Sequence, residues 1–371
     1  MTIDAVPQRL TTDPSGAEPP FVQLLTPEGE RLHHPDYDLD LTDADYRALY
    51  RDLVLVRRID AEATALQRQG ELGLWAACLG QEAAQVGAGR ALLSGDMAFP
   101  TYREHGVAWC RDVDPLTLLG LFRGTTNGGW DPAEHGFALY TIVIGDQCPQ
   151  AVGYAMGMQA DGDEHAVMVF FGDGASSQGD VNEAFIWASV FNAPVVFFCQ
   201  NNQWAISEPL ERQTRIPLYQ RALGFGFPGV RVDGNDVLAT LAVSQATLRR
   251  AREGGGPSLV EAYTYRMGAH TTSDDPSRYR PDAELEAWRL RDPVERMRSF
   301  LYKQQLVDAD YFDALEAEAE ALAVRLREGC RLLVDPKPLD IFTYVYSEPQ
   351  SLVEEERTCF DAYLQSFETG A

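Results

Sequence analysis

Residues 172–207, GDGASSQGDVNEAFIWASVFNAPVVFFCQNNQWAIS, carry the clearest structural pattern in this chain. An apolar run, HAVMVFF, precedes them at residues 165–171, and a second run, PVVFFC, occupies residues 194–199. Both runs have the length of a buried strand, and residues 179–191 between them have helical spacing of apolar side chains. Strands that are buried on both faces and joined by a helix form parallel sheets. The stretch therefore predicts a βαβ unit within an α/β fold.

Further elements of this fold are predicted on both sides of the unit. Thr42 caps a helical pattern that continues to about Gln69, and a second helix is predicted for residues 80–93. Residues 258–265, SLVEAYTY, predict another strand, and two or three charged helices follow between about residues 282 and 329. We therefore expect a parallel sheet flanked by helices, with helical extensions at both the N- and C-terminal ends.

Composition and charge exclude some classes of function. The 371 residues include 31 Lys and Arg against 56 Asp and Glu, a net charge of −25. Because nucleic-acid binding depends on cationic side chains that neutralise phosphates, this balance argues against a nucleic-acid partner. An apolar fraction of 45%, with 10% aromatic residues, excludes general disorder.

Targeting and redox signals predict a soluble cytoplasmic protein. Residues 1–20 contain no apolar stretch after a basic one and are expected to form a flexible tail, and no run of apolar residues is long enough to span a membrane. The six cysteines form no C-x-x-C pair, which favours reduced thiols over zinc or disulfides. They are Cys78, Cys110, Cys148, Cys199, Cys330 and Cys359.

Polar residues follow the two central predicted strands at the point where each strand ends. Asp173 lies between Gly172 and Gly174, and Asn202 ends the second strand. The carboxyl ends of parallel strands meet at one edge of the sheet, where ligands bind. A carboxylate and an amide oxygen are ligands for a magnesium ion whose shell is completed by phosphates, and the glycines let the backbone approach a diphosphate closely.

A competing motif lies at residues 224–229, where GFGFPG matches the G-x-G-x-x-G pattern of dinucleotide-binding sites. Such a site requires a strand before the motif and a helix that opens within it. Here a helical pattern precedes the motif, Pro228 interrupts it, and a short strand follows at residues 230–232. The motif is therefore interpreted as a loop.

GDG, followed after 26 residues by NN, in a segment that spans a strand, a helix and a strand, resembles the thiamin diphosphate motif of transketolase-like enzymes. From about residue 21 to residue 346 the chain is similar to the alpha subunit of the decarboxylating component of 2-oxo acid dehydrogenase complexes. Four other stretches occur in the order seen in this family: GQEA at 80–83, TYRE at 101–104, VDGND at 232–236 and YRMGAHTTSDD at 265–275.

The resemblance implies a thiamin diphosphate-binding fold and a specific set of site residues. Tyr102 and Arg103 would contact the diphosphate, and Asp173, Asn202 and the carbonyl of Trp204 would hold magnesium. The full set of implied cofactor-binding residues is Tyr102, Arg103, Ile142, Ile144, Gly172, Asp173, Gly174, Ala175, Gln200, Asn202, Trp204 and His270. His270, which would lie on a loop over the active site and help to position the cofactor, is the implied catalytic residue.

Some positions depart from the family pattern. Gln200 stands where one branch has an arginine that contacts the diphosphate, so a weaker contact is expected. Asp146 and Val143 replace the hydroxyl and proline positions of potassium-binding relatives, and a potassium site is therefore not carried over. Mammalian relatives are phosphorylated at the position of Thr271, but kinase control is not assumed here. The IVIG segment at residues 142–145 favours pyruvate over branched-chain 2-oxo acids.

The implied activity is oxidative decarboxylation of a 2-oxo acid and transfer of the acyl group to a lipoyl group. The partners implied are a beta subunit, in an assembly of two alpha and two beta chains, and the lipoyl transacylase core. The implied domain covers residues 21–345, followed by a C-terminal tail or helix over residues 346–371. Branched-chain 2-oxo acids, acetoin and a non-catalytic diphosphate-binding module are the alternatives.

Overall fold

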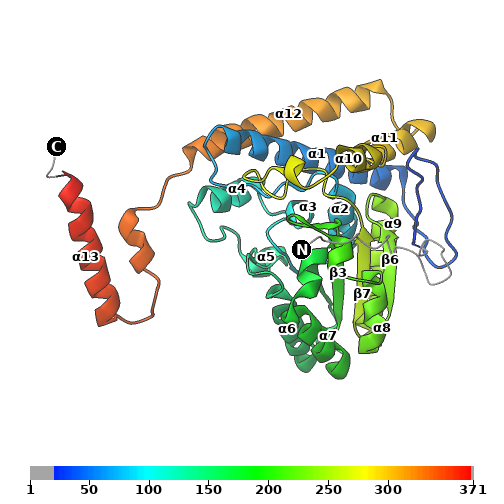
Figure 1. The fold of residues 1–371 in the computed structure, drawn as a ribbon. Coiled ribbons are helices and arrows are strands. Elements are labelled where there is room, and N and C mark those ends of the chain that lie inside the picture. Colours follow the sequence, from blue (N-terminus) through cyan, green and yellow to red (C-terminus); the bar gives the residue numbers. More distant parts are fainter. Residues whose placement is uncertain (1–20, 369–371) are drawn as a thin grey trace, which may run out of the picture.

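The computed structural model describes residues 21–368 and is built around a five-stranded parallel sheet (Figure 1). The strand order is β1 (Met97–Phe99), β2 (Val167–Gly172), β3 (Val195–Asn201), β7 (Ser258–Tyr263) and β6 (Gly229–Asp233). The predicted α/β fold and the three predicted long strands are confirmed. The flexible tail predicted for residues 1–20 lies outside the described residues.

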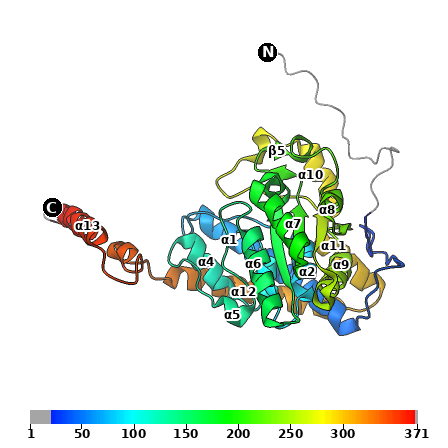
Figure 2. The same cartoon turned by 90° about the horizontal axis from the view of Figure 1, so that it is seen from below.

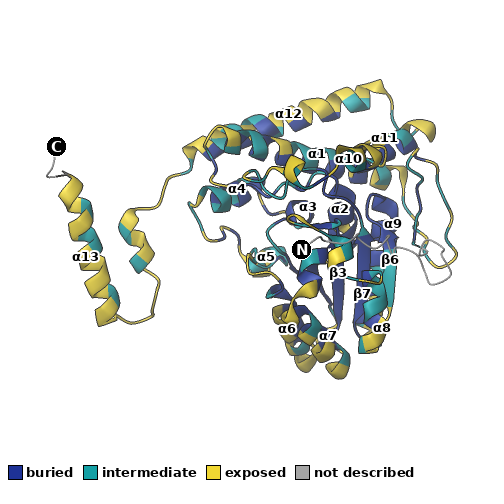
Figure 3. Cartoon of the chain, in the orientation of Figure 1, coloured by how far each residue is buried: buried dark blue, intermediate teal, exposed yellow. Residues whose placement is uncertain are grey.

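Alternate side chains of the central strands face two different hydrophobic layers. Val169 and Phe197 pack with the helices of one layer, whereas Phe170 and Phe198 pack with those of the other. This alternation explains why both strands are uninterrupted apolar runs, since neither face of the sheet meets water. In Figure 3 the central strands of the sheet are accordingly drawn in the colour of buried residues.

Helices cover both faces of the sheet, as Figure 2 shows from below. One layer contains α6 (Gln147–Asp161), α7 (Gly179–Phe191) and α8 (Arg221–Phe225). The other contains α1 (Asp43–Arg68), α2 (Glu82–Ala91), α3 (His105–Cys110), α4 (Pro115–Arg123), α9 (Val237–Arg250), α11 (Pro293–Lys303) and α12 (Ala309–Leu332). Beyond these two layers lie α5 (Pro132–His135), α10 (Asp282–Arg289) and a C-terminal helix described below.

The predicted boundaries of the first helix have a clear local cause. Thr42 is the N-cap of α1, where its hydroxyl accepts from Asp45 N and the Asp45 carboxylate accepts from Thr42 N at 2.8 Å. This capping box satisfies donors that the first turn leaves free. The motif at residues 224–229 forms the connection from α8 to β6, as interpreted from the sequence. The α8 helix ends within it at Phe225, Gly226 has φ +90°, and β6 begins at its last residue, Gly229.

Several elements were not predicted from the sequence. β1 has only three residues, too few for a period to be recognised. The α6 helix buries a stripe of mostly small residues that includes Cys148, Ala151 and Ala155, and such a stripe gives only a weak apolar pattern. The α9 helix begins at Asp236 of the VDGND stretch, whose carboxylate accepts from Leu238 N and Ala239 N.

The C-terminal segment stands apart from the sheet and its helices (Figures 1 and 2). It consists of a short turn at Pro338–Phe342 and the helix α13 (Ser351–Glu368). Tyr344, Tyr363 and Phe367 on this segment are all exposed. No helix within residues 21–368 combines the length and the apolar character needed to cross a membrane.

Candidate active site

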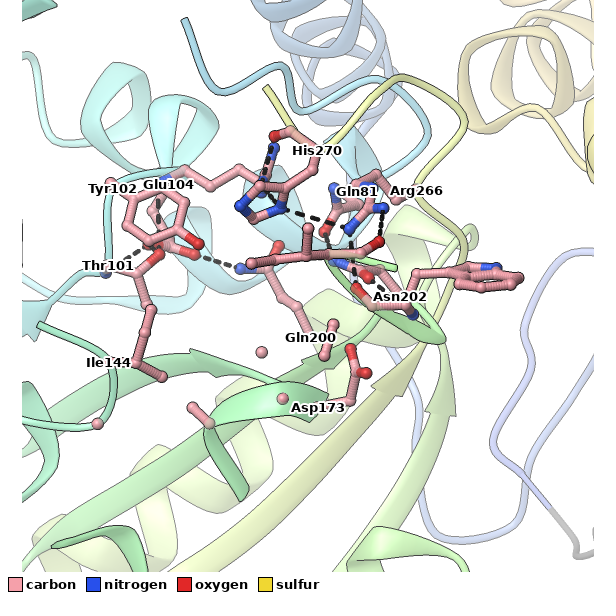
Figure 4. A pocket seen from close by; sticks show the side chains of 18 of the residues that line it. Gln81, Thr101, Tyr102, Glu104, Ile144, Asp173, Gln200, Asn202, Arg266 and His270 are labelled. Atoms are coloured by element: carbon pink, nitrogen blue, oxygen red, sulfur yellow. Dashed lines mark hydrogen bonds between the residues drawn. The ribbon is translucent and has the colours of Figure 1, made fainter. Parts of the chain in front are cut away.

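A cavity of about 250 Å³ lies at the carboxyl edge of the sheet (Figure 4). The segments that follow β1, β2, β3 and β7 all contribute to it, as does the N-terminus of α2. Convergence at this edge follows from the parallel arrangement of the strands. The lining residues are Gln81, Thr101, Tyr102, Arg103, Glu104, Thr141, Ile144, Gly145, Gln147, Gly172, Asp173, Gly174, Ala175, Gln178, Gln200, Asn202, Trp204, Ala205, Ile206, Arg266 and His270.

The segment after β1 is held by a buried carboxylate. Glu104, 1% exposed, accepts hydrogen bonds from the backbone N–H and the hydroxyl of Thr101. These contacts fix the turn that carries Tyr102 and Arg103 to the wall of the cavity. Burial raises the pKa of the Glu104 carboxyl.

Gln200 is fixed by side chains on both of its polar atoms. Its Nε2 donates to Glu104 Oε1, and its Oε1 accepts from Gln85 Nε2 at 3.1 Å. Gln85 Nε2 also donates to the Arg103 carbonyl at 2.9 Å. The Gln200 amide, which stands where some relatives have an arginine, therefore links β3 to the segment after β1. It also lines the cavity.

The two side chains predicted to bind magnesium lie on neighbouring loops of the cavity. Asp173 is 1% exposed and accepts from Gln213 Nε2 at 3.1 Å. Asn202 donates from Nδ2 to Gln81 Oε1 at 3.1 Å. Burial raises the pKa of Asp173 to about 6, so this carboxylate is held where a bound cation would stabilise its charged form.

The carbonyl of Trp204, the third predicted magnesium ligand, accepts a hydrogen bond from a buried arginine. Arg266 donates from Nη1 to the Trp204 carbonyl at 2.8 Å and from Nη2 to the Ile206 carbonyl at 2.7 Å. Burial lowers the pKa of this guanidinium. Arg266 thus joins the segment after β7 to the antiparallel hairpin of β4 (Trp204–Ala205) and β5 (Glu208–Pro209).

His270 lies half-buried in the segment after β7, beside two cationic side chains. Burial, with Arg103 and Arg266 nearby, lowers its pKa to about 4. Its backbone N–H donates to Asp274 Oδ2 at 2.9 Å. At neutral pH the imidazole is therefore uncharged and able to donate or accept a proton at the cavity wall.

The residues of the cavity fit a diphosphate with a divalent cation. Gln81 Nε2 and Arg266 Nε are buried donors without a hydrogen-bond partner among the described residues. Together with Arg103 they supply the donors and positive charge that phosphate oxygens accept. Within residues 21–368 no group of three or more His, Cys, Asp or Glu side chains could hold a metal ion. A cation at Asp173 would therefore take further ligands from amide, carbonyl and phosphate oxygens.

Most of the residues predicted to bind the cofactor meet in this cavity. Ile142 is the exception: its side chain is 64% exposed and outside the set that lines the cavity, because it precedes the turn that points Ile144 inward. Sequence reasoning quoted Gln81, Glu104 and Arg266 within motifs but gave them no role. It missed Gln213, which lies in no recognised motif and reaches Asp173 only through the fold.

Comparisons with known proteins cover nearly the whole chain. A family model described as Dehydrogenase E1 component matches residues 50–324, which include every residue lining the cavity. The 3-methyl-2-oxobutanoate dehydrogenase subunit alpha of Mycobacterium tuberculosis is 44% identical over 344 residues, 92% of this chain and 94% of that protein. The pyruvate dehydrogenase E1 component subunit alpha of Staphylococcus epidermidis is 36% identical, over 90% of this chain and 91% of that protein. The mitochondrial 2-oxoisovalerate dehydrogenase subunit alpha of Homo sapiens is 32% identical, over 94% and 80% respectively.

Proposed function

This chain belongs to the dehydrogenase E1 component family, as the alpha subunit of a 2-oxo acid dehydrogenase, and we propose that its substrate is a branched-chain 2-oxo acid. The single observation that carries the proposal is the 44% identity to a 3-methyl-2-oxobutanoate dehydrogenase subunit, against 36% for a pyruvate dehydrogenase subunit. The preference for pyruvate that the sequence suggested is not confirmed.

Family membership implies thiamin diphosphate, and the proposal adds magnesium at Asp173, Asn202 and the Trp204 carbonyl. When bound, thiamin diphosphate supplies the nucleophilic carbon and the electron sink that decarboxylation of a 2-oxo acid requires. Tyr102 and Arg103 would bind and orient the diphosphate from the segment after β1. In the overall reaction the substrate loses carbon dioxide, and its acyl group passes to a lipoyl group whose disulfide is reduced.

His270 is the side chain of this subunit best placed to accept or donate a proton. Its imidazole is neutral, and its ring lies 6.2 Å from the Tyr102 ring, centroid to centroid. We assign it the role of holding or moving a proton near the diphosphate end of the site, and of orienting the acyl group during transfer.

A beta subunit is the expected partner of an E1 alpha chain, and two alpha and two beta chains form the proposed assembly. Several apolar side chains of the described residues are exposed in positions that suit such a partner. On α7 they are Ile186, Trp187, Val190 and Phe191, and Leu223 on α8 continues the same layer. Ile142 and Val143 are 64% and 68% exposed beside the cavity, where a second chain would complete the site.

The test is turnover by the chain assembled with its beta subunit and a lipoyl transacylase. Dye reduction that depends on thiamin diphosphate and magnesium is measured with 3-methyl-2-oxobutanoate and with pyruvate. We expect kcat/KM at least about tenfold higher for the branched-chain acid, because even one methylene more or less in an apolar pocket changes this ratio by about tenfold or more. A preference for pyruvate would overturn the substrate, and no turnover in a complete assembly would favour a non-catalytic diphosphate-binding module.

A further inference from the structure

Two glutamines from distant segments each hold one of the side chains proposed to bind magnesium. Gln213, in the segment after the β4–β5 hairpin, donates to Asp173 Oδ2 at 3.1 Å. Gln81, at the N-terminus of α2, accepts from Asn202 Nδ2 at 3.1 Å. We propose that Gln213 and Gln81 are positioning residues for magnesium: each one turns an oxygen ligand toward the cation without binding the cation itself.

The orientation of the Asn202 amide follows from its two neighbours. The backbone N–H of Trp204 donates to Asn202 Oδ1 at 3.3 Å, so the oxygen must lie on that side. The amide nitrogen then faces Gln81, whose Oε1 accepts from it. Without an acceptor at Gln81, the buried Nδ2 would lose its partner and the amide would be free to turn.

Gln81 is held firmly enough to fix the orientation of the Asn202 amide. Its side chain is fully buried, and its backbone N–H donates to the Cys78 carbonyl at 2.9 Å. Its backbone carbonyl accepts from Gln85 N at 3.2 Å at the start of α2. A buried side chain on a helix terminus whose backbone is hydrogen-bonded in this way is restricted in its rotamer, and this restriction transmits its orientation to Asn202.

Gln213 holds Asp173 from the turn that follows β5. Its Oε1 accepts from Ser177 Oγ at 3.4 Å, so its Nε2 is directed toward the carboxylate. Its backbone N–H donates to the Leu210 carbonyl at 2.9 Å within the turn that follows β5. A carboxylate with one oxygen fixed by an amide donor presents its other oxygen in a restricted direction, which a cation with strict octahedral geometry requires.

The inference rests on the proposed magnesium site, and its test separates the two. The enzyme assembled with its beta subunit is stripped with EDTA and titrated with Mg²⁺ at saturating thiamin diphosphate, with binding followed by calorimetry. Gln213→Met and Gln81→Met, which keep the side-chain volume, are each expected to weaken Mg²⁺ binding about 10–100-fold. Gln150→Met is the matched control, because Gln150 donates to Asp146 Oδ2 at 2.6 Å in an exposed Gln–Asp pair outside the cavity lining.

A second readout distinguishes positioning from a general structural defect. At saturating Mg²⁺ Gln213→Met is expected to recover the thiamin diphosphate affinity of the unmodified enzyme, whereas a distorted site would stay weak at any metal concentration. Gln81→Met is assessed by Mg²⁺ affinity alone, because Gln81 Nε2, which has no partner among the described residues, is also a donor toward the diphosphate. Gln213 is half-exposed, so Gln213→Met carries the test if the buried Gln81→Met variant fails to assemble.

The Mg²⁺ titrations distinguish a wrong positioning role from a wrong magnesium site. If Mg²⁺ binding in a glutamine variant stays within about twofold of the unmodified enzyme while Asp173→Ala loses it, the positioning role of that glutamine is wrong and the metal site stands. If Asp173→Ala also binds Mg²⁺ with unchanged affinity, the magnesium assignment of the proposed function is wrong.

Discussion

Arg103 Nη2 donates to the backbone carbonyl of His270 at 2.9 Å, so the segment after β1 is tied directly to the segment after β7. The same guanidinium donates from Nη1 to the Ala77 carbonyl, and Arg103 is only 6% exposed. The fork of the guanidinium thus spans two backbone carbonyls while its charge faces the cavity, a geometry that a single ammonium group cannot reproduce.

Replacing Arg103 by Lys should weaken thiamin diphosphate binding about 10–100-fold, because a hydrogen bond to a charged group contributes roughly 1.5–3 kcal/mol and at least one is lost. Calorimetric titration of the assembled enzyme measures the change. Arg298→Lys, on the exposed side of α11, is the control and should bind the cofactor as the unmodified enzyme does. If Arg103→Lys and Arg298→Lys bound thiamin diphosphate with equal affinity, the proposed role of the Arg103 guanidinium would be contradicted.

His270 should react as a neutral imidazole well below neutral pH. Its pKa of about 4 lies below the ordinary value of 6.5, so the folded site excludes a proton that the unfolded chain binds, and stability falls as pH drops through this window. Diethyl pyrocarbonate modifies only the neutral ring, and its rate at His270, followed by mass spectrometry, should be nearly equal at pH 5.5 and 7.5. An ordinary histidine would slow about tenfold, and that result would contradict the shift.

Asp173→Asn should abolish magnesium-dependent cofactor retention and yet stabilise the cofactor-free chain. Because burial raises the pKa of Asp173 from 3.8 to about 6, the folded chain loses up to about 3 kcal/mol as pH rises through that range, and the neutral amide avoids this loss. Chemical denaturation at pH 8 measures the gain.

A second buried carboxylate provides the control for this substitution. Asp236 also has a pKa raised by burial to about 6, but its oxygens accept four backbone N–H groups, from Leu24, Leu25, Leu238 and Ala239. Asp236→Asn should therefore destabilise the chain by about 1–3 kcal/mol. If Asp236→Asn stabilised the chain, burial alone would explain the effects of both substitutions on stability, and the four backbone N–H donors to Asp236 would be unimportant.

Gly174→Ala should damage the cavity, and Ala205→Gly should rescue it. A Cβ added at Gly174 would lie 2.7 Å from Ala205 Cβ, so the β4–β5 hairpin would have to move away from the Asp173 loop. Overpacking of this kind costs about 1–3 kcal/mol, and we expect cofactor affinity to fall accordingly. The double variant removes the colliding methyl group and should bind nearly normally. Absence of rescue would mean that Gly174 is required for a reason other than this contact.

Val190→Asp should prevent assembly with the beta subunit while the chain itself stays folded. Val190 is 73% exposed on α7, beside the stacked rings of Trp187 and Phe191. A buried, unpaired carboxylate in an apolar interface costs several kcal/mol, enough to block co-purification at micromolar concentrations. Leu290→Asp, at an equally exposed position on the end of α10, is the control. Normal assembly of Val190→Asp would place the partner on another face.

The sequence predicted the fold through patterns that are local. The runs at residues 165–171 and 194–199 became β2 and β3 because a strand buried on both faces must be apolar at every position. Asp173 and Asn202 could be placed together in advance because parallel strands bring their carboxyl ends to one edge of the sheet. The three-residue strand β1 was missed because so short a segment has no period.

The hydrogen bonds between side chains of separate segments depend on the three-dimensional fold and could not be predicted from local patterns. Gln213 follows a loop that carries no motif, and its contact with Asp173 depends on how the β4–β5 hairpin folds back over the cavity. The same holds for the neutral state of His270, which follows from burial beside Arg103 and Arg266. Strand and helix patterns repeat along the chain and can be read from it, whereas burial and side-chain partners are set by residues distant in sequence. The chain by itself therefore determined its family and the place of its site, and only folding decided which amides and guanidinium groups hold that site in order.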